Sequence, residues 1–161
     1  MEVIGKAIEQ LKEEGIDNFK VIITLNGKEN RYSESIYSKF NYLPNLVFAG
    51  LLKREEVYKM YGTCDCLLFP SKLETWGLPI SEFKQFRKPM FVADMAYAKE
   101  TAAGCNQVSF FDPTNPKLLA SLMRKFIDGE HIDYKCLDEV KYDGLYSETW
   151  KGMFDILLDK K

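Results

Sequence analysis

Short runs of β-branched and apolar residues alternate with helix-patterned segments along this chain, and that alternation restricts its fold more than any other feature. Residues 1–14 carry apolar side chains at helical spacing and Gly15 ends the pattern, so a helix is expected first. Residues 21–25 form a β-branched run closed by Asn26 and Gly27, which indicates a buried parallel strand. A helix followed by a strand is half of a βαβ unit.

The same alternation repeats toward the end of the chain. Five strands separated by helices predict an α/β fold, namely a Rossmann-like, doubly wound parallel sheet. Because there is no composition break and no internal repeat, residues 1–161 are expected to form a single domain. Further helices are expected over residues 29–40, 54–61, 79–86, 98–103, 116–128 and 147–158, and further strands over residues 46–49, 66–69, 90–93 and 108–111.

The first expected element is unusual for this fold. A doubly wound domain normally begins with a strand, and the turn after that strand often holds the phosphates of a nucleotide. Here a helix comes first. We therefore expect the opening strand and its loop to be missing, or to be supplied from elsewhere in the fold.

The charge balance argues against nucleic acid as a partner. The chain has 22 basic and 24 acidic side chains, so no global field attracts nucleic acid or an anionic membrane surface. No stretch approaches the roughly 20 apolar residues of a membrane span, and the acidic start does not match a secretory signal. A cytoplasmic location fits these features.

The cysteines and the single histidine give no sign of a metal site. Cys64, Cys66, Cys105 and Cys136 lack paired metal-ligand spacing, so reduced and packed thiols are expected. His131 lies in a polar stretch and is expected in a solvated loop without a catalytic role. Neither a metal nor a cofactor is expected.

The segment after the strand at residues 66–69 reads PSKLETWGLPISE and carries the chemistry of the chain. Ligands of doubly wound sheets bind beyond the carboxyl ends of strands. Pro79 suits the first turn of a helix, which places Gly77 and Leu78 at a helix start. Free N–H groups at such a start bind an anion, so a diphosphate is expected there.

Two carboxylates flank this turn. Glu74 precedes the helix and Glu82 lies about one turn inside it, where both can accept hydrogen bonds from sugar hydroxyls. Amides for a diphosphate and carboxylates for hydroxyls describe a nucleotide-sugar site. The residues alone leave an alternative open, in which Glu74 is a solvated loop residue and Glu82 stabilises the helix dipole.

The run resembles the pattern P-S-x-x-E-x-[FW]-G-x-P-x-x-E of the retaining glycosyltransferases with the GT-B fold (family 4, group 1), including its E-x7-E pair. The resemblance extends from Val3 over nearly the whole chain, in the family's order, and the combination of motifs is specific. Phe83, Arg87 and residues 104–107 depart from the pattern and blur the donor specificity. The other matching segments are FAG at 48–50, EEVY at 55–58, CDCLLFP at 64–70, KPMFVAD at 88–94, Glu100 and FDP at 111–113.

The resemblance implies a role for each residue of the site. Glu82 would accept hydroxyls of the nucleotide ribose, and Glu74 would face the transferred sugar as the catalytic residue. The donor would be a UDP- or GDP-sugar, bound without a metal. The other implied contacts are the amides of Thr75, Trp76, Gly77 and Leu78 with the sugar and diphosphate, and the loop of Gly50, Leu51, Leu52 and Lys53 with the base.

The resemblance also implies a hexosyltransferase of polysaccharide biosynthesis, acting with retention on a glycan or lipid-linked acceptor. Its usual Arg and Lys would fall upstream of Met1, and Lys6 is expected to be solvated rather than a replacement. We therefore interpret the chain as the C-terminal, donor-binding GT-B domain without its N-terminal acceptor domain, and expect it to be inactive alone. For the parent protein, peripheral contact with the inner face of a membrane stays open.

Two other interpretations stay open at this stage. The chain can be a non-catalytic, regulatory module that binds a sugar nucleotide or a protein partner, although the retained E-x7-E pair speaks against complete degeneration. It can also belong to a sugar-phosphate synthase or a glycogen-type synthase, which share the GT-B logic.

Overall fold

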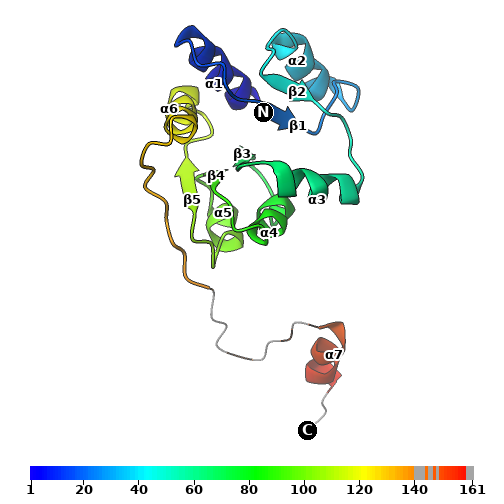
Figure 1. The fold of residues 1–161 in the computed structure, drawn as a ribbon. Helices are drawn as coiled ribbons and strands as arrows, with labels where there is room; N and C mark the ends of the chain where they lie inside the picture. Colours follow the sequence, from blue (N-terminus) through cyan, green and yellow to red (C-terminus); the bar gives the residue numbers. More distant parts are fainter. Residues whose placement is uncertain (140–143, 145–146, 148, 159–161) are drawn as a thin grey trace.

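A computed structural model of the chain describes residues 1–139, 144, 147 and 149–158. Every expected helix and strand is present, with bounds that differ by a few residues (Figure 1). The elements are α1 (Glu2–Glu13), β1 (Val21–Ile23), α2 (Arg31–Phe40), β2 (Leu46–Phe48), α3 (Arg54–Thr63), β3 (Leu67–Phe69), α4 (Leu78–Lys84), β4 (Met90–Ala93), α5 (Ala96–Thr101), β5 (Val108–Phe111), α6 (Pro116–Ile127) and α7 (Trp150–Leu158).

All strand pairs are parallel, which confirms the α/β class with alternating strands and helices. β1 pairs with β2, with Val21 opposite Leu46. β4 lies between β3 and β5, with Met90 opposite Leu67 on one side and Val108 on the other. The five strands do not form one continuous sheet, because no ladder joins β1 to β3 within the described residues.

The first core lies where α1 packs against α6 over one face of the strands (Figure 1). The apolar positions of α1 are buried, as their helical spacing predicted, and each fully buried aliphatic side chain stabilises the fold by about 1.5–3 kcal/mol. Gly5 allows α1 to approach α2 closely, because a Cβ there would lie 2.6 Å from the ring of Phe40. The buried side chains of α1 are Val3, Ile4, Ala7, Ile8 and Leu11.

The second core lies on the opposite face of the three-stranded sheet. Alternation along β4 sends Phe91 to the first core and Met90 and Val92 to the second, so the strand is buried on both faces. Phe83 of α4 packs in this second core with its ring edge against Tyr61 of α3, at a centroid distance of 5.3 Å. Helices therefore cover both faces, as a doubly wound domain requires.

The helix expected over residues 147–158 is present in part as α7, but its apolar residues are not buried. Within α7 no residue is buried, and Trp150 is 77% exposed. Figure 1 shows this helix apart from the other elements. The periodic pattern therefore predicted the helix, and most of its apolar side chains are exposed.

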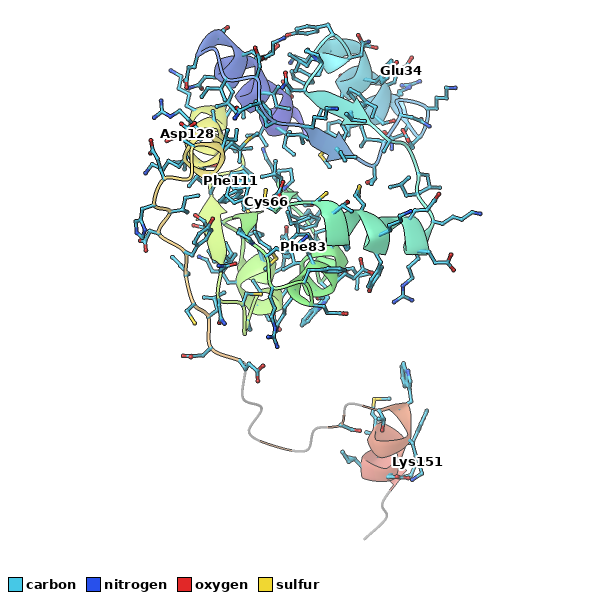
Figure 2. All side chains as sticks on the ribbon, in the orientation of Figure 1. Glu34, Cys66, Phe83, Phe111, Asp128 and Lys151 are labelled. Carbon is cyan, nitrogen blue, oxygen red and sulfur yellow. The ribbon has the colours of Figure 1, made fainter. Side chains whose placement is uncertain are left out.

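The cysteines and the histidine agree with expectation in all but one case. All four cysteines are free, and His131 is exposed. Cys105 is buried and Cys66 is packed against the first core, whereas Cys136 is exposed, so the expectation of a packed thiol is wrong there. Figure 2 shows Cys66 on the side of the sheet that faces α1 and α6, and Phe83 on the other side.

Candidate functional site

The loop between β3 and α4 is the centre of the site. It begins at the buried Pro70 and ends at Gly77, the N-cap of α4. Gly77 has a φ of 78°, in the left-handed region, and a Cβ there would lie 3.0 Å from Cε2 of Tyr97. Both the backbone conformation and the close ring therefore select glycine at the turn into the helix.

Side chains of α5 fix this loop near both of its ends. The Tyr97 hydroxyl donates a hydrogen bond to the carbonyl oxygen of Ser71 at 2.8 Å, and the Thr101 hydroxyl donates to the carbonyl oxygen of Trp76. The indole N–H of Trp76 donates to Oγ of Ser81 at 2.8 Å. The loop is thus held in one shape before any ligand binds.

Glu82 lies on α4 beside α3 and is half-buried. The Tyr61 hydroxyl is 3.4 Å from Oε2 of Glu82, at the long end of hydrogen-bond distance. Burial, and then the charge of Glu82, raise the pKa of Tyr61 to about 12, so this hydroxyl stays a donor. Tyr58 mainly raises the pKa of Arg54, and the charge of Glu82 raises it further. The guanidinium of Arg54 therefore lies near Glu82.

Glu74 lies on the exposed surface of the loop, on the side of α5. Burial mainly raises the pKa of Tyr97, and the charge of Glu74 raises it further, which places the two side chains near each other. The two carboxylates flank the turn from α5 on one side and α3 on the other.

The remaining loop residues that the sequence singled out are surface residues, apart from Gly77. Trp76 is 41% exposed and Leu78 is 64% exposed, and Thr75 is exposed as well. The side chains of these residues are therefore accessible to a ligand, while α5 holds the backbone of the loop in place.

The loop after β2 and the helix α4 line the same cavity. Gly50 is buried with a φ of 72°, and Leu51 is 89% exposed. Leu51 and Leu52 line a cavity of about 1160 Å³ together with Pro79 and Glu82 of α4. Lys53 is exposed and caps α3, where its backbone N–H donates to Oε2 of Glu56 at 2.7 Å. The structure therefore brings Leu51 and Glu82 to one cavity.

Sequence reasoning missed three residues of this region. Tyr97 and Thr101 hold the loop, and only the fold reveals this because they follow it by more than twenty positions. Lys72 is exposed on the loop. Burial mainly lowers the pKa of the Met1 amine, and hydrogen bonds from Thr114 mainly lower the pKa of Asp112. The charge of Lys72 lowers both pKa values further, which places Lys72 near both groups. One signal was available, since Lys72 is the sole basic residue between Phe69 and Glu82 in the sequence.

The described residues offer neither a metal site nor a membrane-spanning helix. They contain no group of three or more His, Cys, Asp or Glu side chains placed to hold a metal ion. Among the helices that the structure describes, none is both long and apolar enough to cross a membrane.

Parallel strands alternating with helices on both faces, and a fixed glycine turn beyond the carboxyl end of β3, define a Rossmann-like domain of the nucleotide-binding type. The family model described as "Glycosyl transferases group 1" matches residues 1–141. The chain therefore belongs to that family and is its C-terminal, donor-binding GT-B domain, which implies a nucleotide-sugar donor. A search of curated proteins found no match.

Proposed function

We propose that this group 1 glycosyltransferase domain binds the nucleoside diphosphate of a UDP- or GDP-sugar between the loop at residues 70–77 and the cavity beside α4. The observation that carries the proposal is the loop itself, which α5 holds near both ends and which Gly77 turns into α4. A loop fixed in advance loses little conformational entropy when a ligand binds.

In this proposal the two glutamates have separate tasks. Glu82 accepts hydrogen bonds from the ribose hydroxyls, because it is half-buried at the cavity and Tyr61 orients its carboxylate. Glu74 faces the transferred sugar, because it lies on the exposed surface of the loop. Leu51 lies against the base, since its exposed apolar side chain and Glu82 line the same cavity.

The diphosphate lies at the amides of residues 75–78. A helix N-terminus attracts anions through its free N–H groups and the helix dipole. Lys72 adds one positive charge from the same loop. The domain therefore contributes a cation of its own to the leaving group, in addition to any that a second domain provides.

The reaction is a retaining glycosyl transfer to a glycan or lipid-linked acceptor, held by an N-terminal domain of the parent protein. Bringing donor and acceptor into reactive geometry is worth about 7–11 kcal/mol of the barrier. A donor-binding domain alone lacks this contribution, so residues 1–161 by themselves do not catalyse transfer. In the parent protein, a lipid-linked acceptor would bring the enzyme into peripheral contact with the inner face of the membrane.

The test is a titration of the 161-residue chain with UDP and with GDP, followed by NMR or calorimetry. We expect a dissociation constant on the order of 1 mM. Glu82→Gln should weaken binding about tenfold, corresponding to about 1.4 kcal/mol, because an amide is a poorer acceptor than a carboxylate. Glu34→Gln, on the exposed surface of α2, is the matched control and should leave the affinity unchanged (Figure 2).

Equal affinity of the Glu82→Gln variant and the unmodified chain would contradict the role of Glu82. Loss of affinity in both variants would point to an effect of net charge instead of a specific contact.

A further inference from the structure

The ammonium group of Lys88 lies among three backbone carbonyls at the carboxyl end of α3. Its Nζ donates to the carbonyl oxygens of Tyr61 at 3.1 Å, Gly62 at 2.7 Å and Cys64 at 2.6 Å. An ammonium group has three N–H donors, so Lys88 uses all of them at this helix end. Lys88 is half-buried, so water competes less for these donors than at an exposed site.

The carbonyls at this end of α3 need partners from outside the helix, because the last four C=O groups of a helix have no intrahelical donor. The carbonyl of Met60 still accepts from the N–H of Cys64 at 2.9 Å, and Lys88 serves carbonyls that follow it. Helix α3 has no basic residue in its own last turn, although the helix dipole favours a cation there. Lys88 therefore supplies both donors and charge from another part of the chain.

The turn that carries Lys88 is fixed on both sides. Before it, Arg87 has a φ of 52°, in the left-handed region that residues other than glycine rarely adopt, and its N–H donates to the carbonyl oxygen of Lys84 at 3.1 Å. After it, the carbonyl oxygen of Pro89 accepts from the N–H of Leu67 at 3.0 Å, where β3 pairs with β4. Lys88 thus ties the end of α3 to α4 and to the sheet.

Tyr61 connects this tether to the donor site. Its carbonyl accepts from Lys88, and its hydroxyl lies 3.4 Å from Oε2 of Glu82. Its ring packs edge-on against Phe83 and Phe86, at centroid distances of 5.3 Å and 5.8 Å. Residues 82–88 therefore hold Tyr61 by its carbonyl, its ring and its hydroxyl.

We propose that Lys88 is a positioning residue of the donor site, which acts through Tyr61 to keep the carboxylate of Glu82 oriented toward the ribose hydroxyls. This inference rests on the proposed role of Glu82. The contact between Tyr61 and Glu82 is already at the long end of hydrogen-bond distance, so a small shift of the end of α3 breaks it. Glu82 would then keep its place on α4 and lose the donor that orients it.

The experiment uses Lys88→Met, which keeps an apolar side chain and removes the three donors. Lys84→Met is the matched control, because Lys84 is also half-buried and its ammonium group also donates to a backbone carbonyl, that of Ala103 beyond the end of α5. Both variants should lose stability, but only Lys88→Met should change the ionisation of Tyr61. That ionisation is followed in the free chain at pH 11 by NMR of ring-labelled tyrosine.

Burial, and then the charge of Glu82, raise the pKa of Tyr61 to about 12, so Tyr61 should be about one-tenth ionised at pH 11. Lys88→Met should raise this fraction at least about threefold, because the pKa falls toward about 10 as the hydroxyl moves into water and away from Glu82. Loss of the Lys88 charge has the opposite effect, since removing a cation raises the pKa of a nearby phenol. Equal ionised fractions in Lys88→Met, Lys84→Met and the unmodified chain would refute the proposal.

Titration with UDP and with GDP tests the link to the donor site. Lys88→Met should weaken binding about fivefold in the unmodified chain and should have no further effect in a Tyr61→Phe chain, because both changes interrupt the same path. Equal weakening in both backgrounds would show that Lys88 acts by another route and would overturn the role of Tyr61.

The two measurements separate this inference from the proposed function. Unchanged affinity in Glu82→Gln, together with a raised ionised fraction of Tyr61 in Lys88→Met, would refute the donor site and keep the tether. An unchanged ionised fraction would refute the tether and leave the donor site standing. If Lys88→Met does not fold, Lys88→Gln replaces it with the same expected and refuting results, because its shorter, uncharged amide still donates at the end of α3.

Discussion

Replacing Gly77 with alanine tests whether the turn before α4 is fixed both by its own backbone and by α5. Gly77 has a φ of 78°, and in an L-residue the left-handed conformation costs about 1–2 kcal/mol. The new Cβ would lie 3.0 Å from Cε2 of Tyr97 and 3.3 Å from Cδ1 of Ile80. Both contacts are tighter than ordinary packing, and such overpacking costs about 1–3 kcal/mol. Gly77→Ala should therefore destabilise the domain by about 2–5 kcal/mol.

Gly15→Ala provides a matched control. Gly15 has a φ of 79°, almost the same as Gly77, but a Cβ there would meet no atom within 4 Å. Gly15→Ala should therefore lower the free energy of unfolding only by the cost of the left-handed backbone conformation, about 1–2 kcal/mol. The difference between the two variants isolates the contact with Tyr97 and Ile80.

The assay is urea unfolding at 25 °C, followed by far-UV circular dichroism. Equal losses in Gly77→Ala and Gly15→Ala would refute the reasoning, because they would show that Tyr97 does not hold the turn. A loss of UDP or GDP affinity in Gly77→Ala alone is also expected, since a shifted Tyr97 would release the carbonyl of Ser71.

Two further predictions concern pH and turnover. Burial and the charge of Glu82 raise the pKa of Tyr61 to about 12, against about 10 in an unfolded chain. The stability that the protonated hydroxyl contributes is therefore complete below pH 10 and is lost as the pH rises toward 12. Tyr61→Phe should reduce the loss of stability between pH 10 and pH 12 in urea unfolding, and an unchanged loss would contradict the raised pKa of Tyr61. The 161-residue chain incubated with sugar nucleotides and glycan or lipid acceptors should form no glycoside, whereas the same chain joined to its native acceptor domain should do so. Comparable transfer by both would show that the catalytic groups are misplaced.

Local sequence patterns were sufficient to predict the elements whose residues have a clear local preference, such as an apolar run for a buried strand or proline for the first turn of a helix. The strands at Met90–Ala93 and Val108–Phe111 were predicted with their observed bounds, because each is a short run in which apolar residues predominate between breaks. Gly77 was predicted at a helix start from Pro79 alone, and the structure confirms it.

Long-range features could not be predicted in the same way. The hydrogen bonds from Tyr97 and Thr101 to the loop join residues more than twenty positions apart, and no periodicity encodes such a pair. An apolar stripe likewise predicts a helix such as α7 but does not identify the surface that covers it. The grouping of the five strands into two sheets was not predicted either, because an apolar run marks a strand but not the strand that pairs with it.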